Sequence, residues 1–147
     1  MSAVIVKWYE AVASGDMNKV KSLLDKDCVF YSPIVFKPQE GRALSVMYLS
    51  AAMRMFHQAE SFKYVKQIVG ERDAVLTFEA QIDHTFIDGL DMISWNENEK
   101  ITTFKVMIRP MKGLLMVGEK MKDQLSNLSL KDKASLKIDQ MRRSFLK

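Results

Sequence analysis

The sequence predicts an α+β fold, with helices in the first part of the chain and a mostly antiparallel sheet in the second. Two observations support this prediction. Apolar residues recur at three- and four-residue steps before residue 57, and they alternate with polar residues at strand spacing between residues 62 and 109. The chain has 147 residues, 48% of them hydrophobic, which is enough to bury the core of one such domain.

Three helices are predicted before the sheet. The first has its apolar positions between residues 5 and 12 and ends at the turn around Gly15, and Asp16 is the expected N-cap of the second. A strand-prone run, residues 28–31, and a proline-containing loop come next. The third helix has a wide apolar stripe that must cover a large surface. Its members are Leu44, Met47, Tyr48, Ala51, Ala52, Met55 and Phe56.

Four strands are predicted after these helices. They cover residues 62–69, 74–82, 85–95 and 101–109. Asp83 and His84 can form the turn between the middle two, residues 96–100 form the next turn, and Pro110 ends the last strand. Consecutive strands joined by short turns indicate antiparallel pairing.

Asp91 is the most informative polar residue, because strand alternation places it on an apolar face. The residues that share its face are Ile87, Gly89, Ile93 and Trp95. Burial raises the pKa of a carboxylic acid, so a partly neutral Asp91 could donate a hydrogen bond to a ligand carbonyl or act as a general acid. The alternative is that a protein group, such as Trp8 Nε1 or a helix N-terminus, satisfies Asp91 internally.

Several function classes find no support. The two histidines and the single cysteine are far apart in sequence, and the glycines are scattered, so we predict neither a metal site nor a phosphate-binding cofactor. No apolar run approaches the ~20 residues of a membrane span. The single Cys28 lies in an apolar run and suits a reducing compartment, so a cytoplasmic protein is expected.

The net charge of +4 is confined to the end of the chain, because residues 131–147 have six basic residues against two acidic ones. A neutral body with a basic tail does not predict a nucleic-acid-binding domain. The tail has apolar residues on one helical face, namely Leu130, Ala134, Ile138, Met141 and Phe145. We therefore predict a domain over residues 1–125 and an amphipathic tail helix over residues 126–147. This helix could dock on its own protein or a sister subunit, or bind a membrane surface or another anionic partner.

The order of predicted elements resembles the SnoaL-like branch of the nuclear transport factor 2-like superfamily. The resemblance covers residues 3–125 and rests on four motifs: Ala13-Ser-Gly-Asp16, Tyr31-Ser-Pro-Ile-Val-Phe-Lys-Pro38 with Gly41-Arg42, Asp91-Met-Ile-Ser-Trp95, and Phe104-Lys-Val-Met-Ile-Arg-Pro110. It implies a cone-shaped, strongly curved sheet that wraps the N-terminal helices around an apolar pocket, and a homodimer of the kind found in bacterial members. The superfamily includes enzymes, binding proteins and dimerisation modules, so the fold does not specify the activity.

The ketosteroid isomerases of this superfamily provide a chemical reference. They use a carboxylate base, a tyrosine on the first helix, and a protonated carboxylic acid on a late strand. By resemblance, Trp8 stands at the tyrosine position, Ser32 at the base position and Asp91 at the late-strand acid. A serine hydroxyl is no enolising base near neutral pH and an indole only donates, so the isomerase mechanism itself is not expected.

These observations predict a protein that binds a small, apolar, carbonyl-bearing molecule. Asp91 is its expected polar anchor and the candidate general acid. The other expected ligand contacts are Trp8, Tyr31, Ser32, Met47, Phe56, Phe78, Ile93 and Phe104. Isomerisation, hydration or dehydration of the ligand remains open, as does binding alone. The alternative is a non-catalytic dimeric interaction module that uses the outer face of the sheet and the basic tail helix.

Overall fold

The computed structural model describes residues 2–126 and confirms the predicted α+β class. The N-terminal part contains α1 (Ala3–Ser14), α2 (Met17–Leu23), β1 (Leu24–Tyr31), β2 (Gln39–Glu40) and α3 (Arg42–His57). The second part contains β3 (Ser61–Val69), β4 (Asp73–Ile82), β5 (Thr85–Trp95), β6 (Ile101–Arg109) and α4 (Met111–Ser126). The predicted tail helix lies outside the described residues, apart from Ser126. No helix within residues 2–126 is long and apolar enough to cross a membrane.

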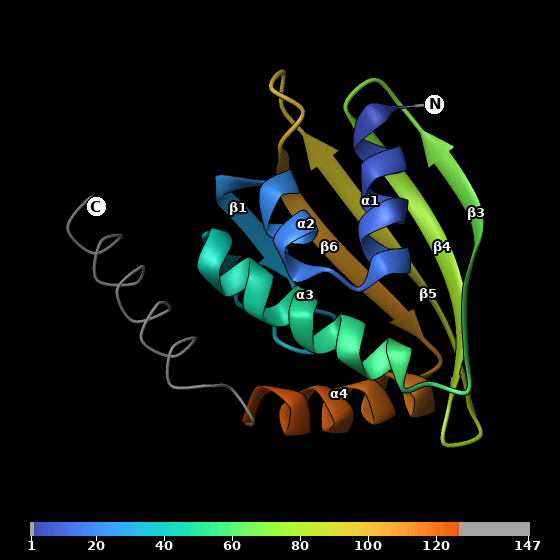
Figure 1. Cartoon of the computed structure of the whole chain (residues 1–147). Helices are drawn as coiled ribbons and strands as arrows, with labels where there is room; N and C mark the ends of the chain where they lie inside the picture. The colour runs from blue at the N-terminus through green and yellow to red at the C-terminus, as the bar shows by residue number, and fades with distance from the viewer. Residues whose placement is uncertain (1, 127–147) are drawn as a thin grey trace.

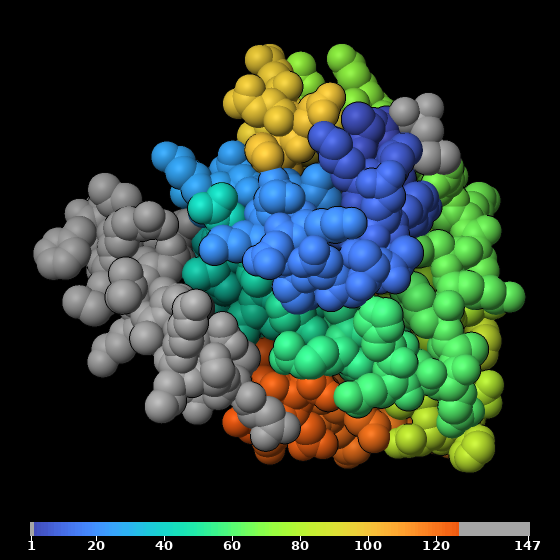
Figure 2. Space-filling model, in the orientation of Figure 1, coloured from blue at the N-terminus to red at the C-terminus, as the bar shows by residue number. Residues whose placement is uncertain are grey.

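The six strands form one curved, mixed sheet in the order β2-β1-β6-β5-β4-β3. All neighbouring strands are antiparallel except β1 and β6, which are parallel. The helices α1, α2 and α3 lie on the concave face, and α4 crosses below α3 at one end of the sheet (Figure 1). In the space-filling view these helices cover most of this face (Figure 2). The concave face therefore holds the buried side chains.

Local sequence explains where the first helices begin and end. The hydroxyl of Ser2 caps α1 by accepting a hydrogen bond from the Val4 amide, and Gly15 ends the helix in the left-handed conformation with φ +68°. Asp16 is the N-cap of α2, as predicted, because its carboxylate accepts from the Asn18 amide at 2.9 Å. These two caps turn the chain so that α1 and α2 both cover the sheet.

The buried side of α3 differs from the predicted stripe. Ser45 is fully buried, because its hydroxyl donates to the Cys28 carbonyl at 3.1 Å, and Leu49 and Met53 continue the same row toward the sheet. Ala51 and Met55 are buried on a second side. This second contact is with α4, a helix that our sequence analysis did not assign. Its buried residues Gly113 and Val117 lie against the same end of the core.

Two apolar clusters fill the concave face. One lies under α1 and α2 and includes Trp8, Leu76 and Phe104, and the other lies between the sheet, α3 and α4 and includes Met55 and Phe78. Tyr64 and Val106 contact both clusters. Cys28, which lies in an apolar run of the sequence, is fully buried. Burial raises the pKa of its thiol to about 11, so it is a core residue rather than a nucleophile.

Strand register brings the central residues of the concave face together. Tyr64 of β3 pairs with Phe78 of β4, and Phe78 pairs with Gly89 of β5. Asp91 lies two residues further along β5, on the same face. The row therefore places an acid and a phenol close to each other under the helices.

Candidate functional site

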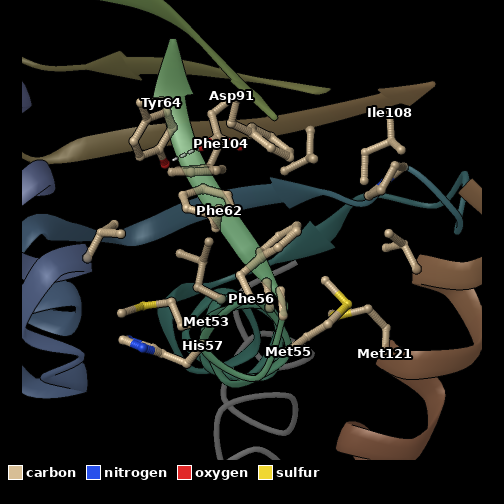
Figure 3. A pocket seen from close by; sticks show the side chains of 18 of the residues that line it. Met53, Met55, Phe56, His57, Phe62, Tyr64, Asp91, Phe104, Ile108 and Met121 are labelled. Atoms are coloured by element: carbon tan, nitrogen blue, oxygen red, sulfur yellow. Dashed lines mark hydrogen bonds between the residues drawn. The ribbon is translucent and has the colours of Figure 1, made fainter. Parts of the chain in front are cut away.

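A cavity of about 540 Å³ lies between the sheet and the helices. Its wall is largely apolar, and it is large enough for a small organic molecule. Figure 3 shows Tyr64 and Asp91 at one side of the cavity, with Met53, Met55 and Met121 at the opposite side. The methionines come from α3 and α4, and their flexible side chains can adapt to different ligand shapes.

The polar end of the cavity consists of a three-residue hydrogen-bond chain. Trp8 Nε1 donates to the Tyr64 hydroxyl oxygen at 3.0 Å, and the Tyr64 hydroxyl donates to Asp91 Oδ2 at 2.7 Å. The residues come from α1, β3 and β5, so only the folded chain assembles them. The Trp8 indole is held by the ring of Phe104, with 4.9 Å between the ring centroids.

Asp91 is buried, as the strand alternation predicts, and only 6% of its surface is exposed. Burial raises the pKa of Asp91 from 3.8 to about 7. The hydrogen bond from Tyr64 lowers this pKa, but its effect is smaller than that of burial. Burial also raises the pKa of Tyr64 well above 10, and the nearby Asp91 adds to that rise. Tyr64 is therefore a hydrogen-bond donor at neutral pH, whereas Asp91 is close to half protonated.

One oxygen of Asp91, Oδ1, has no hydrogen-bond partner within residues 2–126. Within residues 2–126 only the Tyr64 hydroxyl makes a hydrogen bond with the Asp91 side chain. In this part of the chain every side-chain oxygen that is fully enclosed has a hydrogen-bond partner. Oδ1 has none, so it is not fully enclosed and is accessible from the cavity that Asp91 lines. The alternative interpretation, an internal partner for Asp91, holds for Oδ2, which accepts from Tyr64. Trp8 is not that partner, because it reaches the acid only through Tyr64.

The structure places six of the nine predicted site residues in the cavity wall. They are Trp8, Ser32, Phe56, Phe78, Asp91 and Phe104. Ser32 does not act as a base there, because its hydroxyl oxygen accepts hydrogen bonds from the amides of Ile34 and Val35 at 3.0 and 3.2 Å. These bonds fix the loop at the cavity edge, so the role of Ser32 is to hold the wall.

Three predicted contacts lie outside this cavity wall. Met47 is nine residues before Phe56, and at about 100° per residue the two side chains lie on opposite sides of α3. Tyr31 follows the pocket residue Phe30 on β1 and so lies on the other face of the sheet, where Lys105 Nζ is 5.0 Å from the centre of its ring. Ile93 has the predicted parity, but it is fully covered within the core under α1.

Tyr64 is a residue of the candidate site that the sequence patterns do not predict. It lies in a segment correctly predicted as a strand, and it shares a face with Phe62, which also lines the cavity. The available signal was a tyrosine at an inward position of that strand. Its contact with Asp91 depends on the pairing of three strands, which alternation in one strand cannot show.

A second carboxylate at the cavity edge is engaged elsewhere. Glu60 accepts a hydrogen bond from the His84 amide at 2.8 Å, and its carboxylate lies 3.5 Å from His84 Nδ1. These contacts hold Glu60 to the turn between β4 and β5. Within residues 2–126 no group of three or more histidine, cysteine or acidic side chains could hold a metal ion. Asp91 is thus the acid that the cavity encloses.

Comparison with known proteins assigns the family. The model of the SnoaL-like domain matches residues 5–104. The chain belongs to the SnoaL-like family. A search among curated proteins finds no match. The family assignment agrees with the resemblance found in the sequence, and the α+β fold of this SnoaL-like protein agrees with the solved structures of its relatives.

Three of these structures are informative. The SnoaL-like protein is 33% identical to a steroid delta-isomerase from Pseudomonas aeruginosa, with 84% of this chain and 90% of that chain covered and a TM-score of 0.79. It is 26% identical to an uncharacterised protein with a cystatin-like fold from Silicibacter pomeroyi, with coverages of 86% and 88% and a TM-score of 0.79. The epoxide hydrolase/cyclase-like enzyme SalBIII, which has a role in pyran ring formation in polyether salinomycin, shares only the fold with this chain. The identity is 16%, with 75% of this chain and 90% of that chain covered and a TM-score of 0.59.

Proposed function

We propose that this SnoaL-like protein binds a small apolar molecule through one carbonyl oxygen and that neutral Asp91 donates a hydrogen bond to that oxygen. The observation that supports the proposal is the accessible Oδ1 of a buried acid at the end of an apolar cavity. A carbonyl needs a donor, and a carboxylic acid with a pKa of about 7 can supply one near neutral pH.

The same acid can stabilise the negative charge that develops on a carbonyl oxygen while a carbonyl compound is isomerised, hydrated or dehydrated. The similarity to a protein named steroid delta-isomerase supports this reaction class. Ser32, which holds its loop through two amide hydrogen bonds, does not provide the separate base of the ketosteroid isomerases. We therefore assign only the acid role to Asp91.

The first test compares a ketone with a hydrocarbon of nearly equal size, using 2-acetylnaphthalene and 2-ethylnaphthalene. At pH 5.5 Asp91 is mostly neutral, and we expect the ketone to bind about tenfold more tightly, the usual effect of one hydrogen bond. At pH 8.5 the acid is ionised and the preference should disappear, because a carboxylate has no proton to donate. Isothermal titration calorimetry at both pH values measures this difference.

Two variants sharpen that measurement. Asp91→Asn should keep the preference for the ketone at both pH values, since an amide donates whatever the pH. Asp91→Leu should bind both compounds equally. Equal affinities of the two compounds for the unmodified protein at pH 5.5 would refute the proposed role of Asp91.

A second candidate function, subunit pairing, is favoured by the outer face of the sheet. Apolar side chains on β5 and β6 are exposed there, among them Phe86, Met92 and Met107, with 55%, 41% and 50% of their surfaces accessible. Met92 has the opposite parity to Asp91 on β5, so this face points away from the cavity. We infer that two chains pair through it as a homodimer.

Met107→Lys should convert such a dimer to a monomer, because pairing would bury the added charge without a partner. Analytical ultracentrifugation over a concentration series measures the change. Leu115→Lys provides the control, since Leu115 is also exposed but lies on α4. A dimer that survives Met107→Lys unchanged would exclude this face as the contact.

A further inference from the structure

The hydrogen-bond chain from Trp8 to Asp91 has a fixed direction. An indole nitrogen can only donate, so the bond of 3.0 Å between Trp8 Nε1 and the Tyr64 hydroxyl makes the Tyr64 oxygen the acceptor. The phenol has a single hydrogen, and the Trp8 N–H already occupies one side of its oxygen. That hydrogen is therefore left to donate to Asp91 Oδ2, which is 2.7 Å away.

The direction of this chain determines which oxygen of Asp91 can bind a proton. Oδ2 accepts the hydrogen of the Tyr64 hydroxyl. A proton on Oδ2 would point at that hydrogen, and the two would repel each other. The proton of the neutral acid consequently belongs on Oδ1, the oxygen that has no protein partner within residues 2–126 and is accessible from the cavity.

We propose that Trp8 is a positioning residue, which directs the acidic proton of Asp91 into the cavity by fixing the orientation of the Tyr64 hydroxyl. The proposal rests on the proposed function, in which that proton holds a ligand oxygen. It adds a selection rule: the ligand atom at this end of the cavity is a hydrogen-bond acceptor, as in a ketone, an ester or an epoxide.

Loss of the indole N–H should release the hydroxyl. Tyr64 could then rotate and accept the Asp91 proton on Oδ2, and the acid would be satisfied by the protein instead of by the ligand. The two orientations of the Tyr64 hydroxyl place the Asp91 proton on different oxygens, so they also differ in which oxygen is the carbonyl oxygen of the acid. With Trp8 present the carbonyl oxygen is Oδ2 and accepts from Tyr64, whereas after the rotation it is Oδ1 and accepts from no group of the described chain.

Infrared spectroscopy of the free protein at pH 5 distinguishes the two orientations. The band of the Asp91 acid carbonyl is isolated by subtracting the spectrum of Asp91→Asn, and a hydrogen bond to its oxygen lowers its frequency. We expect Trp8→Phe to shift this band upward, in the same direction as Tyr64→Phe. The double variant should show no further shift beyond that of Tyr64→Phe. An unchanged band in Trp8→Phe would overturn the proposal.

Trp8 is 97% buried beside Phe104, so Trp8→Phe also leaves a gap. Benzothienylalanine at position 8 solves this problem, because it keeps the bicyclic shape and lacks only the N–H. It should shift the band as Trp8→Phe does. The same replacement of Trp95, a core residue whose indole makes no hydrogen bond within residues 2–126, should leave the band unchanged and is the matched control.

The ligand measurement separates this inference from the proposed function. Benzothienylalanine at position 8 should lower the affinity for 2-acetylnaphthalene at pH 5.5 about tenfold and leave that for 2-ethylnaphthalene unchanged. If the unmodified protein shows no ketone preference, the proposed function fails, while the infrared band of the free protein still decides the role of Trp8. The other case is a protein that prefers the ketone and keeps this preference with benzothienylalanine at position 8. If the infrared band is also unshifted in that variant, only the role of Trp8 is refuted.

Discussion

Asp91→Asn should stabilise the protein at pH 8 by up to about 4 kcal/mol, and it should leave the stability at pH 4 nearly unchanged. Burial raises the pKa of Asp91 from 3.8 to about 7 in the folded state. Between these pH values the folded chain binds a proton that the unfolded chain has released. The free energy of unfolding therefore falls as pH rises through this window. The contribution of the neutral acid is fully present below pH 3.8 and is lost above pH 7.

Asparagine is the appropriate replacement, because its carbonyl can accept from Tyr64 as Asp91 Oδ2 does, and it does not ionise. Urea denaturation of both proteins between pH 4 and 8 measures the effect as the difference between their unfolding free energies. Asp123→Asn, at an exposed position of α4, provides the control and should follow the unmodified protein at every pH. A difference between Asp91→Asn and the parent that does not change with pH would show that folding does not raise the pKa of Asp91.

Gly89→Ala should destabilise the protein by about 3 kcal/mol. A Cβ at this position would overlap the tip of the Phe78 ring and would lie 2.9 Å from the backbone carbonyl oxygen of Met107. The ring cannot easily retreat, because Phe56 and Phe62 pack against it with ring centroids at 5.3 Å in both cases. Thermal and urea denaturation measure the loss of stability.

Gly118→Ala is the matched control for this substitution. The added Cβ would meet only the Ile34 side chain, whose terminal methyl is nearest at 3.3 Å, and alanine is favoured over glycine within a helix such as α4. We expect a change between zero and a gain of about 1 kcal/mol. If Gly89→Ala were as mild as Gly118→Ala, the close packing of Phe78 on β5 would be incorrect.

The periodicity of the sequence predicts most of the fold, because each strand has its own alternation. Asp91 is the clearest case, since its parity with Ile87 and Trp95 correctly predicts burial. The apolar stripe predicted for α3 agrees less well with the residues that are buried on this helix. The α3 helix is buried on two sides, and a single stripe cannot represent contacts with both the sheet and α4. Ser45 shows the same limit, because its burial depends on the Cys28 carbonyl of another element.

The candidate site was only partly predictable for a related reason. Trp8 and Phe104 lie in the cavity wall because their own helix and strand orient them inward. Tyr64 becomes a partner of Asp91 only through the register of β3, β4 and β5, and the curvature of the sheet brings both under Trp8. Ile93 has the correct parity and still lies outside the cavity, because α1 covers that part of the strand. Long-range pairing thus decides which inward residues line the cavity.

The parallel pairing of β1 with β6 has a consequence for the order of assembly during synthesis. Leu24 pairs with Ile101, so β1 has no sheet partner except the two-residue β2 until β6 has been made. The hairpins β3–β4 and β4–β5 close short loops and can form earlier. Tyr64 and Asp91 would then meet while still accessible to water. Trp8 of α1 contacts Tyr64, so full burial of the acid also requires α1 to pack on the finished sheet.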